Sequence, residues 1–342
     1  MAMINEHPRV LGWTPRKLMG IQFHSTGSYL PPRVVTNDEL AARLGFDSDW
    51  IFQRSGILER RHAGPEMATS DMSIEAARAA LDRAGARVDD VDLLIVATAT
   101  PDHVGTSTAC LIQNRMEMTC PAFDLTAACG GFVYATATAA QFVATGTSQL
   151  ALVIGADCMS RIIDPQDQGT YPLFGDGAGA VLMSAGSGEQ GLLSYALGAD
   201  GAGQPMLYRP VGGSRQPPDP ARMIERGEFL KMDGRAVFRW AVQALEATVS
   251  DVLSFANLQR NEVDLYVLHQ ANIRILQTAA DHLGIDMSRL FVNLDRYGNT
   301  TAGTIPIALD EACAQGRLER GLTLVISGFG AGLTWGTAAI KW

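Results

Sequence analysis

An internal repeat limits the possible folds of this chain more than any other feature of its sequence. Two segments, "VDDVDLLIVATAT" and "RNEVDLYVLHQA", each read as a buried strand preceded by a helix, and aligning Asp92 with Asp264 sets them 172 residues apart. The strand candidates "LALVIGADC" from Leu150 and "LTLVISGFG" from Leu322 recur at the same spacing, and "AFDL" and "FVNL" recur at 169. Two copies of one unit predict a two-halved fold and not a solenoid.

Each half alternates helical patterns with short Val/Ile/Leu runs, which indicates an α/β fold with buried sheets. The segment after Cys129, "GGFVYATATAAQFVATG", is apolar or small on every face, so it predicts a helix buried on all sides. We therefore expect two sheets with buried helices between them. The predicted divisions are an N-terminal extension (1–19), a first half (20–190) and a second half (191–342). A Gly/Pro-rich loop is expected at 198–220, and the Arg-rich segment 50–61 is expected at the surface.

The composition excludes several classes of protein. With 47% hydrophobic and 18% charged residues, the chain is too apolar to be disordered. A formal charge of −9 disfavours a strongly basic nucleic-acid surface. No charged side chain occurs from Leu125 to Ala156, but "GTSQ" from Gly146 divides this stretch, so we expect a buried helix and strand and no membrane span.

The cysteines and the N-terminus bear on location. Five cysteines are scattered with no C-x-x-C pair, which argues against a disulfide framework or a structural zinc site. The first 19 residues lack the apolar core of a secretory signal. A reducing cytoplasm is therefore the expected location, and any single cysteine could be a nucleophile.

Cys129 is the strongest candidate nucleophile. It follows the strand candidate "AFDLTAA" and stands where the apolar helix begins. The free N–H groups and dipole of a helix N-terminus favour a thiolate, so we expect a lowered thiol pKa. An ordinary buried cysteine is the alternative reading.

His269 and Asn299 are candidates to act with Cys129. His269 ends the buried strand in "LYVLHQANIRIL", and catalytic groups in α/β folds gather at such strand ends. Asn299 in "NLDRYGNTTAGTIPIAL" lies in the half-two segment that corresponds to the Cys129 segment. A structural histidine and a turn asparagine remain the plain alternatives.

The three side chains together match one kind of chemistry. A Cys thiolate can take an acyl group from a thioester. A neutral imidazole and a carboxamide can donate two hydrogen bonds to one enolate oxygen, which suits decarboxylation of a malonyl thioester followed by carbon–carbon bond formation. A papain-like hydrolase would use the same residue types, but the local cysteine signature of that family is absent.

Glycine-rich segments supply one further candidate and one false lead. "SGFGAGLTWG", residues 327–336, follows a buried strand and could bring backbone N–H groups to a substrate as an oxyanion hole. "GDGAGA", residues 175–180, formally matches a dinucleotide-binding loop, but a strand pattern follows it where that site needs a helix. No P-loop motif occurs, and the six histidines form no H-x-x-x-H pair.

These motifs together resemble the β-ketoacyl-acyl-carrier-protein synthase III family of the thiolase fold superfamily. The resemblance runs from about residue 20 to 342 and rests on segments in the family's order: "GSYLPPRVVTNDEL", "DWIFQRSGILERR", "AFDLTAACGGF", "FGDGAGAVL", "LHQANIRI", "YGNTTAGTIPIAL" and "GFGAGLTWG". It implies a duplicated α/β fold of five layers, αβαβα, in a homodimer. It also implies condensation of an acyl-CoA primer with malonyl-acyl carrier protein, which initiates fatty acid synthesis.

The resemblance assigns roles to individual residues. Cys129 would be acylated, His269 and Asn299 would promote decarboxylation, and backbone N–H groups of Cys129 and the loop at Gly330 and Ala331 would bind the oxyanion. Further roles concern CoA, with Trp50 on the adenine, Arg54 and Arg274 on phosphates, and Gly234 and Asn272 along the pantetheine. Arg239 and Arg274 would dock the acidic carrier protein. No metal or resident cofactor is implied, since acyl-CoA is a substrate.

Three departures from the family pattern leave parts of this assignment open. Gln168 stands where the second adenine-stacking residue is often arginine, and Asp281 and His282 replace lysines of the docking surface. Gly105 stands where acetyl-specific members carry an aromatic residue that closes the acyl pocket across the dimer, so we expect primers longer than acetyl. The alternative is a related condensing enzyme or acyltransferase of specialised metabolism. A binding or scaffold subunit is disfavoured because the three catalytic residue types are all present.

Overall fold

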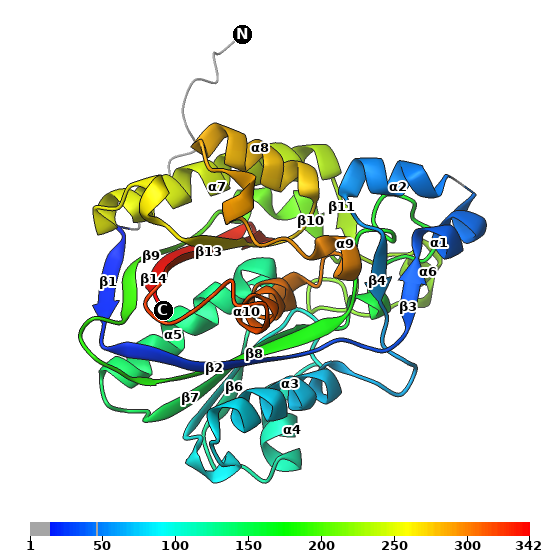
Figure 1. Cartoon of the computed structure of the whole chain (residues 1–342). Helices are drawn as coiled ribbons and strands as arrows, with labels where there is room; N and C mark the ends of the chain where they lie inside the picture. The colour runs from blue at the N-terminus through cyan, green and yellow to red at the C-terminus, as the bar shows by residue number, and fades with distance from the viewer. Residues whose placement is uncertain (1–13, 46) are drawn as a thin grey trace.

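The computed structural model describes residues 14–45 and 47–342, which form two five-stranded sheets lying face to face (Figure 1). The first sheet has the order β2-β8-β7-β5-β6. Its strands are β2 (Ile21–Tyr29), β5 (Leu93–Ala97), β6 (Ala122–Leu125), β7 (Leu150–Asp157) and β8 (Gly177–Ala185). β5 is parallel to β6 and β7, whereas β8 is antiparallel to β7 and β2. The parallel strands β5 and β7 are almost wholly buried, as their Val/Ile/Leu runs predict.

The second sheet repeats this plan in the order β1-β9-β14-β13-β12. Its strands are β1 (Arg16–Met19), β9 (Gly191–Ala199), β12 (Leu265–Leu268), β13 (Thr323–Gly330) and β14 (Thr334–Lys341). β12 is parallel to β13, and β14 is antiparallel to β13 and β9. Four strands of the first half, in the order β2-β8-β7-β5, match four of the second, β9-β14-β13-β12, in order and direction, which confirms the duplication predicted from the sequence.

The structure corrects the register of the repeat by one residue. The Asp92 N–H donates to the Leu150 carbonyl at 3.1 Å, and the Asp264 N–H donates to the Thr323 carbonyl at 2.9 Å. Leu150 therefore corresponds to Thr323 and not to Leu322, and β7 and β13 are 323 − 150 = 173 residues apart. Alignment of apolar runs could not detect this shift. Leu150 is matched with Leu322 in one register and with Thr323 in the other, and both residue types are common in strands.

The predicted third strand of the second half, "FVNL" from Phe291, does not form. Leu290 makes only an isolated parallel bridge to Tyr266, beside β12, where β6 runs beside β5 in the first half. The chain turns into the short helix α9 (Leu294–Tyr297) directly afterwards, so no ladder develops.

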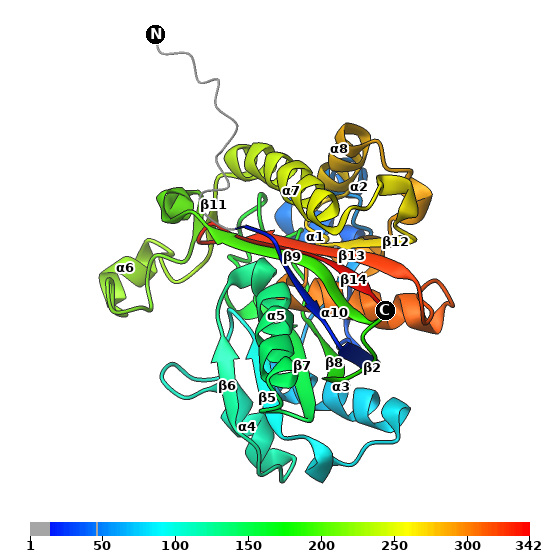
Figure 2. The same ribbon diagram turned by 90° about the vertical axis from the view of Figure 1, so that its left-hand side faces the viewer.

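Helices form the other three layers (Figures 1 and 2). α5 (Gly131–Ala144) and α10 (Thr304–Ala314) lie between the sheets and are buried over most of their length, as the all-apolar pattern after Cys129 predicts. The outer helices are α3 (Thr69–Ala84) and α4 (Thr108–Arg115) on the first sheet, and α7 (Gly234–Ala256) and α8 (Ile273–Leu283) on the second. The layers run α, β, α, β, α, which confirms the expected five-layered fold.

Each central helix begins with an equivalent single 3₁₀ turn, Ala128–Gly130 before α5 and Thr301–Gly303 before α10. The remaining short elements gather at one end of the layers (Figure 1). They are β3 (Val34–Thr36), α1 (Asn37–Leu44), α2 (Ser48–Ser55), β4 (Glu59–Arg61), β10 (Leu207–Tyr208), α6 (Pro220–Ile224) and β11 (Lys231–Met232).

The predicted division near residue 190 falls between β8 and β9, the last strand of the first sheet and a strand of the second. β1 is an exception to this division, because it precedes residue 20 yet pairs with β9. The end of the predicted extension 1–19 is thus an edge strand of the second sheet, and residues 1–13 lie outside the described part of the chain. Among the described helices, none has the length and apolar character needed to cross a membrane.

The Arg-rich segment 50–61 is not entirely at the surface, contrary to the expectation. Arg60 is 0% exposed, and its guanidinium donates to the carbonyls of Val35 and Pro172 and to Asn37 Oδ1. Burial lowers the pKa of Arg60 to about 10. These neutral acceptors compensate for part of the cost of removing the cation from water.

Candidate active site

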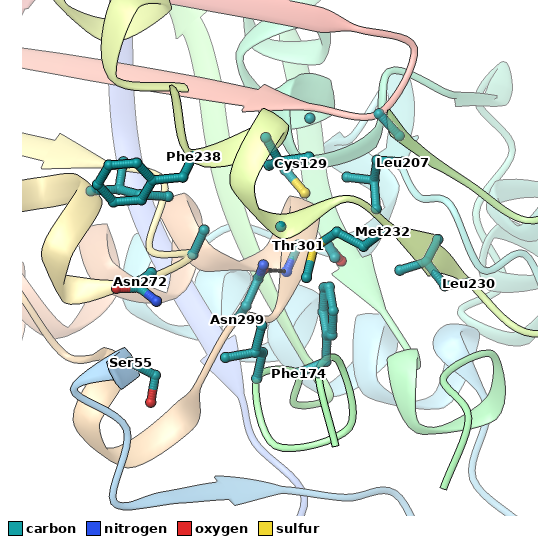
Figure 3. Close-up of a pocket in the computed structure, with 18 of the residues that line it drawn as sticks. Ser55, Cys129, Phe174, Leu207, Leu230, Met232, Phe238, Asn272, Asn299 and Thr301 are labelled. Carbon is teal, nitrogen blue, oxygen red and sulfur yellow. Dashed lines mark hydrogen bonds between the residues drawn. The ribbon is translucent and has the colours of Figure 1, made fainter. Parts of the chain in front are cut away.

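A cavity of about 960 Å³ lies at the end of the layers where the short elements gather, and both halves of the chain line it (Figure 3). Cys129, His269 and Asn299 all line this cavity, together with Gly330 and Ala331. The sequence separates these residues by up to 331 − 129 = 202 positions, so the fold brings them together. The constellation predicted from strand ends is therefore present in one pocket.

The backbone at Cys129 makes a tight turn against the second sheet. Ala128 has φ of +45°, and Cys129 follows it in the 3₁₀ turn that precedes α5. Gly328 and Gly330 of β13 pack directly on this turn, because a Cβ on Gly328 would lie 2.8 Å from the Cys129 carbonyl oxygen. A Cβ on Gly330 would lie 2.6 Å from the Cys129 nitrogen. Glycine is required at both positions for this close approach.

The missing side chain of Gly330 also leaves space at the Cys129 N–H. This N–H lies at the start of the helical turn, where backbone donors have no intrahelical acceptor. Gly330 and Ala331 line the same cavity as Cys129. The arrangement suits an oxyanion, which needs donors aimed at one point in a water-poor site.

The ionisation state of Cys129 differs from the expectation. The side chain is only 7% exposed, and burial, followed by the charge of Asp157, raises the pKa of its thiol. A helix N-terminus contributes at most about 2 kcal/mol in the other direction. Full burial shifts a pKa by up to about 3–5 units, each worth about 1.4 kcal/mol, so burial dominates. The resting residue is the neutral thiol, and a thiolate has to form during the reaction.

His269 is a buried neutral imidazole. It follows β12, is 1% exposed, and burial lowers its pKa to about 3. Its Nδ1 lies 2.7 Å from Thr304 Oγ1, and the Phe329 ring packs edge-on with centroids 5.1 Å apart. The Thr304 hydroxyl has two acceptors within reach, His269 Nδ1 and the Thr301 carbonyl at 3.0 Å. When it donates to Nδ1, the ring proton is on Nε2, and this N–H can donate to a substrate oxygen.

Asn299 is fixed through both its backbone and its side chain. Its N–H donates to the Leu173 carbonyl at 2.8 Å, and its carbonyl accepts from the Gly175 N–H at 3.0 Å. Its Oδ1 accepts from the Thr301 N–H at 2.8 Å (Figure 3). Because the amide oxygen is held in this way, the Nδ2 group is the part of the side chain left to act as a donor.

The residues predicted to contact CoA or the carrier protein also line the cavity. They are Trp50, Arg54, Gln168, Gly234, Arg239, Asn272 and Arg274. The Arg54 guanidinium carbon stands 5.0 Å from the Trp50 ring centroid, so the cation lies over the aromatic face. Gln168 Nε2 donates to the Leu44 carbonyl at 2.9 Å. Asp281 and His282 are exposed on α8, and His282 is paired with Glu246 at 3.2 Å.

Asn272 has a structural role in addition to its predicted one. It is the N-cap of α8, where its Oδ1 accepts from the Arg274 N–H at 2.9 Å. Its Nδ2 donates to the Arg54 carbonyl at 2.9 Å. The side chain thereby joins α8 to α2 across the mouth of the cavity.

Gly105 does not line the cavity of its own chain. It lies in an exposed loop with φ of +94°, and a Cβ there would meet nothing within 4 Å. Its predicted role as a gate to the acyl pocket therefore requires a second copy of the chain.

Sequence reasoning missed two groups of residues at the site. One group forms apolar walls of the cavity, namely Met159, Ile162, Leu207, Leu230 and Met232. Figure 3 shows Leu207, Leu230 and Met232 on the same side of the cavity as Cys129. Leu207, Leu230 and Met232 lie in or near the Gly/Pro-rich stretch 198–220. Isolated large apolar residues in such a stretch could have indicated from the sequence that this loop lines a cavity. The other group is Asp157, Thr301 and Thr304. Thr301 and Thr304 form hydrogen bonds to Asn299 and His269, and Asp157 accepts one from Thr301. Within residues 14–45 and 47–342, no cluster of three or more His, Cys, Asp or Glu side chains could hold a metal ion.

Comparison with known proteins gives consistent matches over nearly the whole chain. Residues 123–201 match the family model "3-Oxoacyl-[acyl-carrier-protein (ACP)] synthase III", and residues 253–342 match the model of its C-terminal part. A β-ketoacyl-[acyl-carrier-protein] synthase III of Rhodopirellula baltica is 49% identical, covering 95% of this chain and 99% of the relative. One from Desulfitobacterium hafniense is 45% identical, covering 95% and 98%.

Solved structures agree. The 3-oxoacyl-[acyl-carrier-protein] synthase III of Aquifex aeolicus superposes with a TM-score of 0.88 at 37% identity, covering 94% of this chain and all of that one. The priming β-ketosynthase of the R1128 polyketide pathway superposes with a TM-score of 0.87 at 32% identity, covering 95% and 96%.

Proposed function

The chain belongs to the β-ketoacyl-acyl-carrier-protein synthase III family, and we propose that Cys129, His269 and Asn299 carry out its reaction. The enzyme is an acyltransferase that initiates fatty acid synthesis. It condenses an acyl-CoA primer with malonyl-acyl carrier protein and releases 3-oxoacyl-acyl carrier protein, CoA and CO₂. The observation that carries the assignment of residues is that one thiol and two neutral hydrogen-bond donors line a single cavity. The alternative in specialised metabolism is not favoured, since the curated relatives share the synthase III name.

In the first half-reaction, Cys129 takes the acyl group from acyl-CoA. The sulfur forms a bond to the thioester carbon, the bond from that carbon to the CoA sulfur breaks, and the thiol proton ends on the departing CoA. The oxyanion that forms in between would accept hydrogen bonds from the Cys129 N–H and from the loop at Gly330 and Ala331. The resting thiol is neutral, so its proton leaves only as the thioester is attacked.

In the second half-reaction, malonyl-acyl carrier protein replaces CoA. Asn299 Nδ2 and His269 Nε2–H would donate to the malonyl thioester oxygen, which becomes the enolate oxygen as the carboxylate leaves as CO₂. The enolate carbon then attacks the acyl carbon, and the carbon–sulfur bond to Cys129 breaks with its electron pair on sulfur. The thiolate takes up one proton from solvent, which restores the neutral resting thiol. Two neutral donors suit an enolate oxygen, because their burial prevents competition from water. No resident cofactor takes part in this scheme.

The mouth of the cavity would receive CoA and then the carrier protein. Trp50 would stack on the adenine beside Arg54, which with Arg274 would meet the CoA phosphates. Gly234 and Asn272 would border the pantetheine. Arg239 and Arg274 would contact the acidic carrier protein, despite the overall charge of −9. The position of all these residues on one cavity supports this assignment.

We further propose that the enzyme acts in the cytoplasm as a homodimer. All five cysteines are free, which is consistent with a reducing compartment. In the dimer, Gly105 of one chain would face the acyl pocket of the partner and leave it deep enough for primers longer than acetyl.

Intact-protein mass spectrometry with a panel of acyl-CoAs tests the first half-reaction. The wild type is expected to gain the mass of one acyl group, and Cys129→Ala is expected to gain none. A preference for medium-chain primers would support the Gly105 argument, and a clear acetyl preference would refute it. An acyl adduct that persists in Cys129→Ala would refute Cys129 as the acceptor.

A further inference from the structure

The duplication provides a second copy of the nucleophile turn. Thr301 corresponds to Ala128, and both have positive φ, +50° and +45°. Ala302 therefore corresponds to Cys129. The glycine contacts are duplicated as well, since a Cβ on Gly155 of β7 would lie 2.2 Å from the Ala302 carbonyl oxygen. This is the counterpart of the contact between β13 and the Cys129 carbonyl.

The two turns differ at one position of the facing strand. Where β13 has Gly330 beside the Cys129 N–H, β7 has Asp157 beside the Ala302 N–H. Asp157 is 0% exposed, and its Oδ2 accepts from the Ala302 N–H at 3.0 Å and from the Thr301 hydroxyl. The anion-binding position that the Cys129 turn leaves open is thus filled, at the Ala302 turn, by a side chain of the protein.

The other oxygen of Asp157 is equally engaged. Oδ1 accepts from the N–H groups of Ala99 at 2.7 Å and Thr100 at 3.0 Å, and from the hydroxyls of Thr98 and Thr100 at 3.1 and 2.9 Å. In the described part of the chain, no Arg, Lys or His forms an ion pair with this carboxylate. The Asp157 carboxylate is held by neutral donors alone. The most direct reason for burying it there is that it fixes the conformation of the backbone segments whose N–H groups it binds.

The turn that Asp157 grips holds a catalytic side chain. Thr301 is β-branched, so its positive φ is strained and needs support from its surroundings. The Thr301 N–H donates to Asn299 Oδ1, which fixes the direction of the Asn299 amide. Two residues after this turn, Thr304 Oγ1 lies 2.7 Å from His269 Nδ1. Both proposed enolate donors therefore depend on the conformation of one short segment.

We propose that Asp157 is a positioning residue for the decarboxylation step. Its carboxylate holds the Thr301–Ala302 turn in the conformation that aims the Asn299 amide into the cavity. The inference rests on the proposed function of Asn299. It predicts that loss of the Asp157 carboxylate impairs decarboxylation and does not slow acyl transfer to Cys129, which uses the other turn and on which the Asp157 charge acts only by raising the thiol pKa.

Asp157→Asn is the sharpest variant. With its oxygen kept toward the Ala99 and Thr100 donors, the new NH₂ group faces the Ala302 N–H, where two donors repel each other. We expect the kcat for CO₂ release from malonyl-acyl carrier protein to fall by about 10- to 100-fold, since misplacement by about 1 Å has that effect. The KM for malonyl-acyl carrier protein should stay within about threefold. Formation of acyl-Cys129 should not slow, because removing the Asp157 charge removes one cause of the raised thiol pKa.

Asp310→Asn is the matched control. Asp310 is a carboxylate of α10 that is 5% exposed and accepts hydrogen bonds from Thr26, Ser28 and Arg83, away from the cavity. This variant is expected to lower the melting temperature while the ratio of decarboxylation to acylation stays at the wild-type value. A role of Asp157 in stability alone would make the two variants behave alike, and that result would overturn the proposal.

The remaining outcomes are also decisive. If Asp157→Asn fails to fold, Thr301→Ala removes the hydroxyl that contacts Asp157, and the same selective loss of decarboxylation is expected. Unchanged CO₂ release in a folded Asp157→Asn or Thr301→Ala protein would overturn the positioning role while leaving the proposed function intact. A wild type that forms the acyl adduct but releases no CO₂ would instead refute the proposed function itself.

Discussion

The turns Ala128–Gly130 and Thr301–Gly303 have the same backbone path, and only one of them carries a reactive group. Each begins with a residue of positive φ, leads into a central helix, and packs against a glycine of the facing strand. The first turn bears Cys129 and leaves its N–H open, whereas the second bears Ala302 and has its N–H bound by Asp157. The same backbone conformation thus carries the proposed nucleophile in one half and is held by a buried carboxylate in the other.

The division of labour between the halves follows from this difference. In the proposed assignment, the first half provides the nucleophile, and the second half provides the His269 and Asn299 side chains and the strand that borders the Cys129 N–H. Ala128 and Cys129 of the first turn and Thr301 of the second line one cavity. Neither half carries a complete site.

Moving the thiol from one turn to the other is the strongest test of this comparison. The double variant Cys129→Ala, Ala302→Cys places a cysteine at the equivalent position, where Asp157 occupies the N–H that an oxyanion would need. We expect condensation to fall by at least about 10³-fold, as in Cys129→Ala alone. Acyl transfer to the relocated thiol at a substantial rate, measured by mass spectrometry, would show that the turns are interchangeable.

Adding a methyl group at Gly330 tests whether the open N–H matters. The Cβ of Gly330→Ala would lie 2.6 Å from the Cys129 nitrogen and would close the oxyanion position. Acylation by acyl-CoA should slow by about 10²- to 10³-fold, the usual effect of losing an oxyanion donor. Gly201→Ala is the control, because a Cβ at Gly201 meets nothing within 4 Å, and it should acylate at the wild-type rate.

Removing the Asn299 amide separates the contributions of the two halves. In Asn299→Ala, we expect CO₂ release from malonyl-acyl carrier protein to fall by about 10²-fold, because one of two enolate donors is lost. Formation of the acyl-Cys129 adduct should continue at a rate close to that of the wild type. Equal losses in both half-reactions would contradict the division of labour.

The buried His269 makes stability depend on pH. Its folded-state pKa is lowered to about 3, so between about pH 6.5 and 3 the unfolded chain binds a proton that the folded chain does not. Stability therefore falls as the pH falls, by about 1.4 kcal/mol per unit from this residue. Denaturant titrations from pH 7 to 5 should give a shallower dependence for His269→Asn than for the wild type. Parallel dependences would mean that the imidazole is charged when buried.

The smallest expected effect concerns the mouth of the cavity. Gln168→Arg would place a guanidinium at the second position expected to stack on the CoA adenine, beside Trp50. An exposed cation–π contact of this kind contributes about 0.5–1 kcal/mol. The KM for acyl-CoA should therefore fall by about two- to fivefold, with kcat for acylation unchanged. An unchanged or higher KM would show that Gln168 does not border the adenine.

The sequence was sufficient to predict the fold class, the repeat and the buried central helix, because each leaves a pattern of apolar runs or a motif. It also identified Cys129, His269 and Asn299 as candidates, and all three line one cavity. It could not predict the ionisation of Cys129, since burial of the thiol depends on both halves packing around it. Asp157 was read only as the end of a strand. Its correspondence with Gly330 could not be recognised either, because the sequence alignment of the two halves was one residue out of register.

The place of β1 in the second sheet has a consequence for the order in which the protein matures during synthesis. β1 (Arg16–Met19) leaves the ribosome early, but its partner β9 is made about 170 residues later. α5 likewise has one face that the second sheet covers, and β13 and β14 of this sheet are the last strands of the chain. The nascent first half must therefore wait with an unpaired strand and an apolar helix face exposed, a state that favours aggregation and chaperone binding until translation ends.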